Sequence, residues 1–272
     1  MTDTLRVTML GSGSSSGVPR IDGDWGVCDP NEPRNRRMRC GLLVQRWRGP
    51  AGDPAEATTV LIDTSPDLRA QMLAADVKRL DGVIYSHDHA DQTHGIDDLR
   101  GFVITQRRRV RVWMDEATRA TLMHRFQYCF EARGGYPAIL DHAGDVGAGE
   151  VIIVNGPGGE IAALPIAQNH GYVVSYGFRI GDVGYSNDVV GLDDAAFAAL
   201  AGLEVWIVDA LRLKPHPTHS HLEQTLEWIA RLKPGRAVLT NMHIDMDYRS
   251  LVASLPAGVE PGYDLWRMDF AV

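Results

Sequence analysis

The stretch Ser86–Gly95, SHDHADQTHG, holds the side chains best suited to chemistry in this sequence. It places His87, His89, Asp91 and His94 directly after the apolar run GVIY. Polar groups buried at the end of a strand are costly unless something compensates them. In an extended or gently turning segment, residues two apart point the same way, so the side chains of His87, His89 and Asp91 can present three ligands to one side. Imidazole and carboxylate suit Zn, Mn or Fe, so the stretch predicts a metal site, with a hydrogen-bonded polar turn as the alternative.

Other polar residues follow apolar runs further along the chain. They are the His, Asp or Asn residues at which β-type runs end: Asp63, His170, Asp188, Asp209, Asn241 and His243. When several strands each deliver such a residue at the same kind of position, the side chains can converge on one edge of the sheets. This repetition favours a metal site over an isolated turn and places the site at that edge.

Short apolar runs of β type and amphipathic helical patterns alternate along the chain. The β-type runs cover residues 5–10, 41–47, 58–63, 82–86, 109–114, 150–154, 161–166, 172–180, 203–210 and 236–240. The helical patterns cover residues 66–75, 116–127, 193–202 and 221–232. This mixture predicts an α/β (α+β) protein with a two-layered sheet core and helices outside. No linker or short repeat interrupts the pattern, so we expect residues 1–272 to form a single domain.

One long segment has no periodicity. Residues 11–39 are rich in Gly, Ser, Pro, Asp and Arg, which predicts a loop, and a loop of this length in a compact domain is usually functional. Its start, GSGSSSG, meets neither the dinucleotide-binding fingerprint nor the GK[ST] phosphate loop. We interpret it as a tight turn whose backbone borders the site.

Composition narrows the class of protein. The net charge of −8 argues against a whole-protein role on nucleic acid or on a membrane surface. No apolar run approaches the roughly 18 residues of a membrane span, and the N-terminus lacks the pattern of a signal peptide. Three cysteines, Cys28, Cys40 and Cys129, form a sparse, odd set that suits a reducing compartment. We therefore expect a cytoplasmic protein without a membrane partner.

The motif H-x-H-x-D, followed by NHG, SNDV and NMHID, resembles the metallo-β-lactamase superfamily. The stretches LGSGSSSGVPR, GIDDLR and residues 213–243 are most similar to its phosphodiesterase branch, which includes the cyclic-phosphate phosphodiesterase of the carbon–phosphorus lyase pathway. The resemblance covers nearly the whole chain. It implies a four-layer αββα sandwich of the metallo-β-lactamase type, with a site for one or two divalent ions, Zn or Mn.

The resemblance also assigns roles to residues. It implies that His87, His89 and His170 bind one metal, that Asp188 bridges two metals, and that Asp91 binds the second.

This chain departs from the family at two positions. The family expects His directly after the motif Asp and His in the C-terminal LTH, where this chain has Gln92 and Asn241. His94 and His243 each lie two residues further on and are candidates to replace the missing imidazoles. Gln and Asn oxygens are weaker ligands than His, so a mononuclear or unequally filled centre is an alternative to a dinuclear one.

The expected chemistry is hydrolysis by metal-bound hydroxide. A divalent cation lowers the pKa of its bound water toward about 7, and Asp91 and Asp188 would hold and orient that water. The leaving alkoxide needs a proton, and HPTHSH offers His216, His219 and His221. By its context before the helical pattern, His219 best fits the catalytic His of the branch. The alternative is that His219 has no catalytic role and only lies near the start of the helix.

The leading functional hypothesis is a phosphodiesterase that acts on a small cyclic or nucleotide-like phosphodiester. A tRNA 3′-processing endonuclease ranks lower because the chain is acidic and has no inserted RNA-binding arm, so no stable nucleic-acid complex is expected. A thioester or lactam hydrolase would use the same hydroxide. A non-catalytic phosphate-binding protein with a degenerate second metal site is the alternative of another class. Substrate-contacting residues are not identified, and a homodimer is expected only by analogy with relatives.

Overall fold

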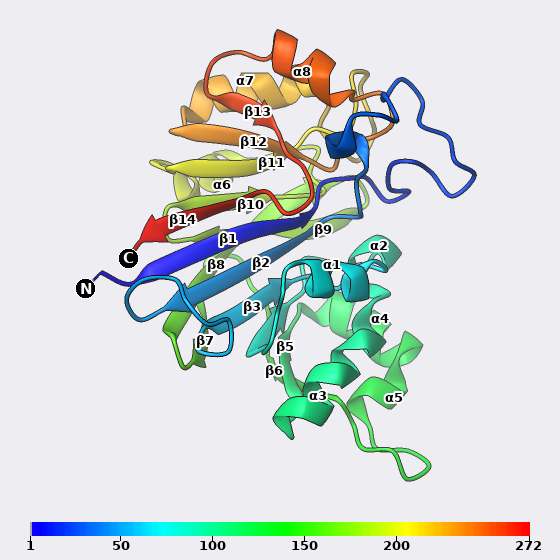
Figure 1. The fold of residues 1–272 in the computed structure, drawn as a ribbon, viewed down its shortest axis with the longest axis vertical. Helices are drawn as coiled ribbons and strands as arrows, with labels where there is room; N and C mark the ends of the chain where they lie inside the picture. The colour runs from blue at the N-terminus through cyan, green and yellow to red at the C-terminus, as the bar shows by residue number, and fades with distance from the viewer. Residues whose placement is uncertain (1) are drawn as a thin grey trace. The chain divides into compact units, whose positions relative to one another are not determined.

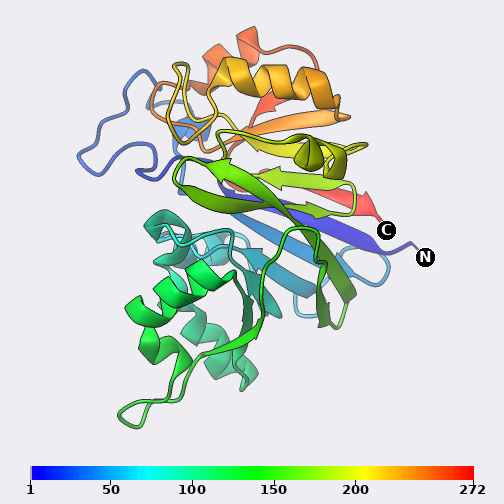
Figure 2. The ribbon, with the colours of Figure 1, turned by 180° about the vertical axis from the view of Figure 1, so that it is seen from behind.

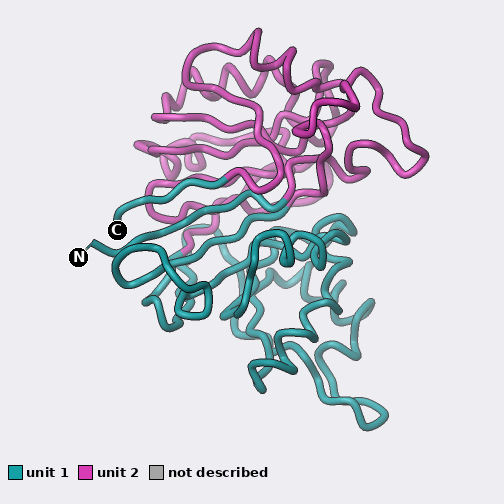
Figure 3. Tube along the Cα trace, viewed as in Figure 1, with its two compact units in different colours: residues 1–10, 41–162, 267–272 teal, residues 11–40, 163–266 magenta. Residues whose placement is uncertain are grey.

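The computed structural model describes residues 2–272, which form two compact units (Figure 3). Unit 1 comprises residues 1–10, 41–162 and 267–272, and unit 2 comprises residues 11–40 and 163–266. The chain therefore passes between the units four times, and each unit is assembled from separate segments. The single domain expected over residues 1–272 stays a prediction. None of the helices formed by residues 2–272 is both long and apolar enough to span a bilayer.

Unit 1 is built on a seven-stranded sheet with the order β14-β1-β2-β3-β4-β5-β6 (Figure 1). Its strands are β1 (Thr4–Gly11), β2 (Gly41–Trp47), β3 (Thr58–Ile62), β4 (Gly82–Ile84), β5 (Val110–Trp113), β6 (Leu140–Gly144) and β14 (Arg267–Ala271). β3 to β6 run parallel, whereas β1 pairs with β14, and β2 with β3, in antiparallel fashion. Every residue of β3 and β4 is buried, as expected for parallel strands covered on both faces.

The helices of unit 1 follow the parallel strands. They are α1 (Leu68–Ala74), α2 (Ala90–Thr93), α3 (Arg100–Gln106), α4 (Glu116–Arg125) and α5 (Gln127–Phe130), with a 3₁₀ turn η2 (Ile96–Leu99). Figures 1 and 2 show them beside the strands β3 to β6. α4 begins where Asp115 accepts the backbone N–H of Thr118 at 2.9 Å, an N-cap bond. The predicted helices at residues 66–75 and 116–127 are confirmed.

The second sheet has the order β13-β12-β11-β10-β9-β8-β7. Its strands are β7 (Ile152–Gly156), β8 (Gly159–His170), β9 (Val173–Ile180), β10 (Val183–Ser186), β11 (Val205–Asp209), β12 (Arg236–Thr240) and β13 (Val259–Pro261). β7 and the first residues of β8 belong to unit 1, and the remainder of the sheet belongs to unit 2. β9 is antiparallel to both β8 and β10, while β10 to β13 run parallel. The carboxyl ends of β8, β10, β11 and β12 therefore meet at one edge of this sheet.

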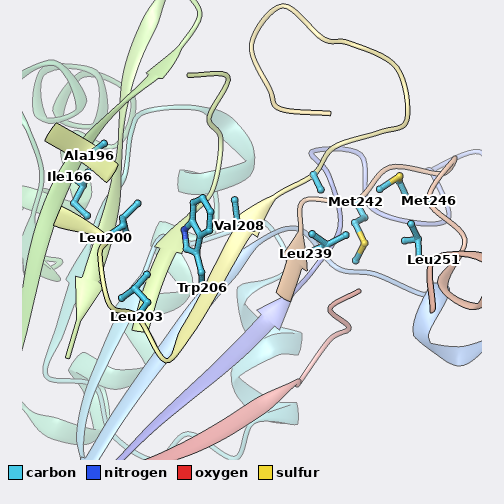
Figure 4. Packing of buried hydrophobic residues seen from close by; sticks show 11 residues of the cluster. Ile166, Ala196, Leu200, Leu203, Trp206, Val208, Leu239, Met242, Met246 and Leu251 are labelled. Atoms are coloured by element: carbon cyan, nitrogen blue, oxygen red, sulfur yellow. The ribbon is translucent and has the colours of Figure 1, made fainter. Parts of the chain in front are cut away.

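Helices α6 (Asp194–Ala199), α7 (Leu222–Leu232) and α8 (Tyr248–Ser254) complete unit 2, confirming the helices predicted at residues 193–202 and 221–232. Figure 4 shows a buried cluster centred on Trp206 and continued by Val208 and Leu239, with Ala196 of α6 and Leu251 of α8 among its members. Partly buried residues of α7, among them Trp228, pack against the same cluster. The indole N–H of Trp206 donates to Ser186 Oγ at 3.0 Å, so its polar atom is paired inside the core. This packing fixes the strand ends that carry the site.

The segment of residues 11–39 is largely irregular, as predicted, with one 3₁₀ turn η1 (Pro33–Asn35). It is nevertheless held firmly within unit 2. Arg37 is buried and donates to the Met246 carbonyl at 2.7 Å. Asp264 accepts the backbone N–H groups of Ser12 and Met38 at 3.0 and 2.7 Å. The loop is thus a structured border of unit 2.

Candidate metal centre

In unit 1, a hydrogen-bond relay orients His87. Asp63 follows β3 directly, is buried, and accepts the backbone N–H and the hydroxyl of Ser86 at 2.7 and 2.8 Å. Burial raises the pKa of Asp63 to about 7, although the two hydrogen bonds from Ser86 act to lower it. Above that pH the carboxyl group is ionised and only accepts hydrogen bonds. The Ser86 hydroxyl proton is then committed to Asp63, so its oxygen accepts from His87 Nδ1, 3.0 Å away. This tautomer leaves the lone pair of His87 on Nε2, the arrangement that a metal ligand requires.

The rest of the motif is only partly extended. His87 and His89 lie on non-helical backbone, with ring centroids 4.5 Å apart in an edge-to-face arrangement. From Ala90 the chain turns into α2, so Asp91 lies in the first helical turn and does not continue the extended alternation. A carboxylate is favourable there because it faces the positive end of the helix dipole. Asp91 therefore lies beyond the extended part of the motif, and its role as a ligand stays a prediction.

His94 ends α2 as its C-cap residue. It is exposed, and its ring lies edge-to-face on Phe126 with centroids 5.5 Å apart. This placement does not support its prediction as a replacement ligand.

In unit 2, His170, Asp188 and His219 come together at the sheet edge. Each offers a ligand atom, and these atoms lie within 4.8 Å of one another. His170 is buried, and its Nδ1 lies 2.7 Å from the carbonyl oxygen of Thr218. Since a carbonyl only accepts, Nδ1 carries the proton and Nε2 carries the lone pair. His170 therefore has the same tautomer as His87.

His219 is held by a second carboxylate at the same edge. Its Nδ1 lies 2.9 Å from Oδ2 of Asp209, which is fully buried at the end of β11. Nδ1–H therefore donates to Asp209, and Nε2 is the ring nitrogen that faces other groups. The neighbouring His221 occupies the N-cap position of α7 without a side-chain cap bond. His221, and not His219, is therefore the N-cap residue itself, and the catalytic role of His219 stays a prediction.

The third His of HPTHSH also lies near this edge. His216 Nδ1 accepts the backbone N–H of Thr218 at 3.3 Å. Burial, followed by the nearby His219 and Arg212, lowers the pKa of His216. Its environment is therefore one that disfavours positive charge on the ring.

Asn241 and His243 differ in what they contact. Asn241 follows β12, and its Nδ2 donates to Asp188 Oδ1 at 3.1 Å. His243 has Nδ1 at 3.1 Å from Asp245 and Nε2 at 2.5 Å from a guanidinium nitrogen of Arg20. Among residues 2–272, the groups suited to a metal include neither His243 nor His94. The placement of His243 does not support its prediction as a ligand.

A cavity of about 290 Å³ opens within unit 2 beside His219 and Asn241. It is lined by Ser14, Ser15, Ser16, Arg20, Leu211, Arg212, His216, His219, Asn241 and His243. Two arginines and three histidines contribute to this lining, and no carboxylate of the described residues does. The serines come from GSGSSSG, so that turn borders the site as expected. The cavity favours an anionic small molecule.

Sequence reasoning left several of these roles out. It placed Asp63 and Asp209 at strand ends without a function, and it did not consider Ser86 or the Thr218 carbonyl. In the sequence, only position points to these roles: Ser86 precedes the first His of the motif, and Asp209 ends a buried strand. Which groups donate and which accept depends on packing that the sequence does not display.

Comparison with known proteins identifies similar chains. A family model described as "Beta-lactamase superfamily domain" matches residues 58–244. A solved structure described as a new diphosphatase from the PhnP family is 33% identical, covers 99% of this chain and 98% of that chain, and has a TM-score of 0.84. Zn²⁺-bound PqqB from Methylobacterium extorquens is 15% identical, covers 97% and 100% of the two chains, and has a TM-score of 0.72, which shows a shared fold. The predicted αββα fold class is confirmed.

One curated protein has a different description. The octanoyltransferase of Porphyromonas gingivalis (strain ATCC BAA-308 / W83) is 28% identical over 263 residues, which is 96% of this chain and 50% of that protein. The chain thus spans half the length of this relative. The activity of the longer protein does not by itself describe the matching half.

Proposed function

Because the chain belongs to the metallo-β-lactamase superfamily and, within it, to the PhnP family, we propose that it is a metal-dependent phosphodiesterase. Its substrate is a small cyclic or nucleotide-like molecule with a phosphodiester or diphosphate bond. The cavity beside His219 carries this proposal, since its lining includes Arg20 and Arg212 and no carboxylate of the described residues, in a chain of net charge −8. The similar solved structure is a diphosphatase, which agrees with a substrate of this class.

The side chains fit a divalent cation. His87 in unit 1 and His170 in unit 2 each have Nδ1 committed as a donor, which presents Nε2 as a ligand. We propose that these two bind one ion together with His89, and that Asp188 completes the set. A bound divalent ion lowers the pKa of water and offsets charge on the phosphoryl oxygens. Zn and Mn are both compatible with imidazole and carboxylate ligands.

The chain's own groups position the substrate and move the proton. Asp91 and Asp188 orient the attacking water. Arg20 and Arg212 in the cavity attract the anionic substrate and offset its charge. His219, fixed through Nδ1 by Asp209, donates a proton from Nε2 to the leaving alkoxide.

Hydrolysis assays test this function. We expect the metal-loaded protein to hydrolyse bis(p-nitrophenyl) phosphate, a 2′,3′-cyclic nucleotide or a diphosphate diester. His87→Ala should lower the rate by more than about 100-fold because it removes a ligand. His124→Ala, which changes an exposed His on α4, is the matched control and should keep full activity. Equal rates for His87→Ala and wild type would refute the proposal, as would turnover of a thioester or lactam alone.

A further inference from the structure

Side-chain amides stand beside the two carboxylates that a second cation would use. Gln92 is buried in α2, and its Nε2 donates to Asp91 Oδ2 at 3.3 Å. In unit 2, Asp188 accepts from two amides, Asn241 Nδ2 at Oδ1 (3.1 Å) and Asn187 Nδ2 at Oδ2 (2.8 Å). Each of the two carboxylates therefore already has an N–H donor.

The orientation of these amides follows from charge. If Asn241 were turned over, its carbonyl oxygen would lie 3.1 Å from a carboxylate oxygen, and the two acceptors would repel. Asn241 Nδ2 also lies 3.1 Å from His219 Nδ1, but the proton of that ring nitrogen is donated to Asp209, so the carboxylate of Asp188 decides the orientation. The same argument holds for Gln92 and Asp91. An amide nitrogen has no lone pair to give a metal, so these two side chains act as donors where the family has imidazole ligands. A second cation would therefore meet two N–H donors at the positions where the family has imidazole ligands.

The candidate replacements do not supply the missing ligands. His94 is exposed against Phe126. The guanidinium of Arg20 only donates, so it occupies the lone pair of His243 Nε2, and Asp245 accepts from the other ring nitrogen. A cation bound to His243 would also lie against the positive charge of Arg20.

We infer that the chain binds one divalent cation and not two, because Gln92 and Asn241 present N–H donors to Asp91 and Asp188 where a second cation would need two more ligand atoms. This inference rests on the proposed function, since it requires the first ion to bind. Asp188 then contributes to a single centre, with its orientation fixed by Asn187 and Asn241.

Metal content and magnetic resonance test the inference. The protein is saturated with Mn²⁺, desalted, and measured by elemental analysis and electron paramagnetic resonance. Wild type should hold about one ion per chain and give the signal of isolated ions. The double variant Gln92→His/Asn241→His should hold about two ions and give an exchange-coupled spectrum.

Two further variants keep the test decisive if the double variant fails to fold. Asn241→Asp keeps the size of the side chain and places a second carboxylate beside Asp188. Because a cation would offset the repulsion between the two negative charges, this variant should also hold more than one ion. Asn169→Asp adds the same charge at an exposed position of unit 2 and should remain at about one. Two ions in wild type, or one ion in both Gln92→His/Asn241→His and Asn241→Asp, would overturn the inference. No ion in wild type would instead refute the proposed function.

Discussion

At the scale of single residues, three strand ends carry strained backbone. Asp63, Asp188 and Asn241 have φ values of 65°, 52° and 60°, in the left-handed region that few non-glycine residues adopt. They follow β3, β10 and β12 respectively, and all three are buried. Such strain is typical of functional sites, and Asp and Asn tolerate it best among L-residues. The left-handed backbone at these three residues costs some stability and directs their polar side chains.

Asp209 positions His219, and its charge can be removed with little change of shape. Asp209→Asn should lower kcat by about 10- to 100-fold, because a neutral partner holds the imidazole less firmly. KM and metal content should stay near wild type, since Asp209 is not proposed to touch the ion. Steady-state kinetics with parallel metal analysis check both parts. Loss of metal would show that Asp209 acts on the ion, and an unchanged kcat would show that it does not act through His219.

Ser86 is predicted to act on metal affinity instead. Ser86→Ala removes the acceptor of His87 Nδ1–H, so the tautomer with its lone pair on Nε2 is no longer enforced. We expect divalent-ion affinity to fall by about 10- to 100-fold, measured by competition with a chelating dye. At saturating metal most of the activity should return. Failure of added metal to restore activity would contradict a role in ligand positioning.

At the scale of elements, the backbone conformation of Gly171, in the turn after β8, is connected with the position of His170. Gly171 has φ +77°, and a Cβ there would lie 2.5 Å from Thr218 Cγ2. Since the Thr218 carbonyl holds His170, Gly171→Ala should weaken metal binding as well as lower stability by about 1–2 kcal/mol. Gly202→Ala is the matched control, because Gly202 has φ +75° with nothing within 4 Å of the added Cβ. Equal metal affinity in the two variants, measured by titration, would argue against the link.

The N-cap of α8 should make stability depend on pH. Burial alone raises the pKa of Asp247, but hydrogen bonds from the Ser250 backbone, Asn35 and the Asp29 backbone outweigh it and lower the pKa to about 2. Because the folded value lies below the ordinary value of 3.8, this stabilisation is present above about pH 4 and is lost as pH falls toward 2. It amounts to at most about 2 kcal/mol.

Urea unfolding of Asp247→Asn tests this dependence. The variant keeps the size of the side chain but has no group to titrate. At pH 7 it should be less stable than wild type by about 1–2 kcal/mol, and the gap should narrow as pH falls below 4. A gap that stays constant between pH 7 and pH 3 would show that the charge of Asp247 does not stabilise α8.

The sequence predicted most elements but not all. Strands β3, β4 and β11 follow from continuous apolar runs. β6 was not predicted, because its sequence LDHAG has one buried apolar residue and pairs with β5 through tertiary context. The four residues of α2 are too few to show helical periodicity.

The candidate site, like the fold, was predictable from the sequence only in part. The parallel run of β10 to β12 brings Asp188, Asp209 and Asn241 to one edge, and strand-end position alone indicated this. The partner of His243 was not predictable, since Arg20 reaches it from a loop 223 residues earlier in the chain. Contacts of that separation depend on the fold and not on local pattern.

At the scale of the whole molecule, the proposed ligands come from segments far apart in the sequence. His87 and His170 are 83 residues apart, so an ion bound to both requires the folded chain. An ion that binds only the folded chain stabilises it by about 2.7 kcal/mol at 100 times its dissociation constant. Thermal unfolding of wild type should therefore shift upward with added Mn²⁺ or Zn²⁺ and downward with a chelator.

Two histidine variants decide whether His87 and His170 bind the same ion. His87→Ala and His170→Ala should each abolish the metal-dependent shift, while His124→Ala should retain it. The alternative is a centre within unit 2 alone, formed by His170, Asp188 and His219, whose ligand atoms already lie within 4.8 Å of one another. In that case only His170→Ala would lose the shift, and His87→Ala would still be stabilised by metal. Calorimetry of the three variants with and without metal therefore tests this ligand set independently of any substrate.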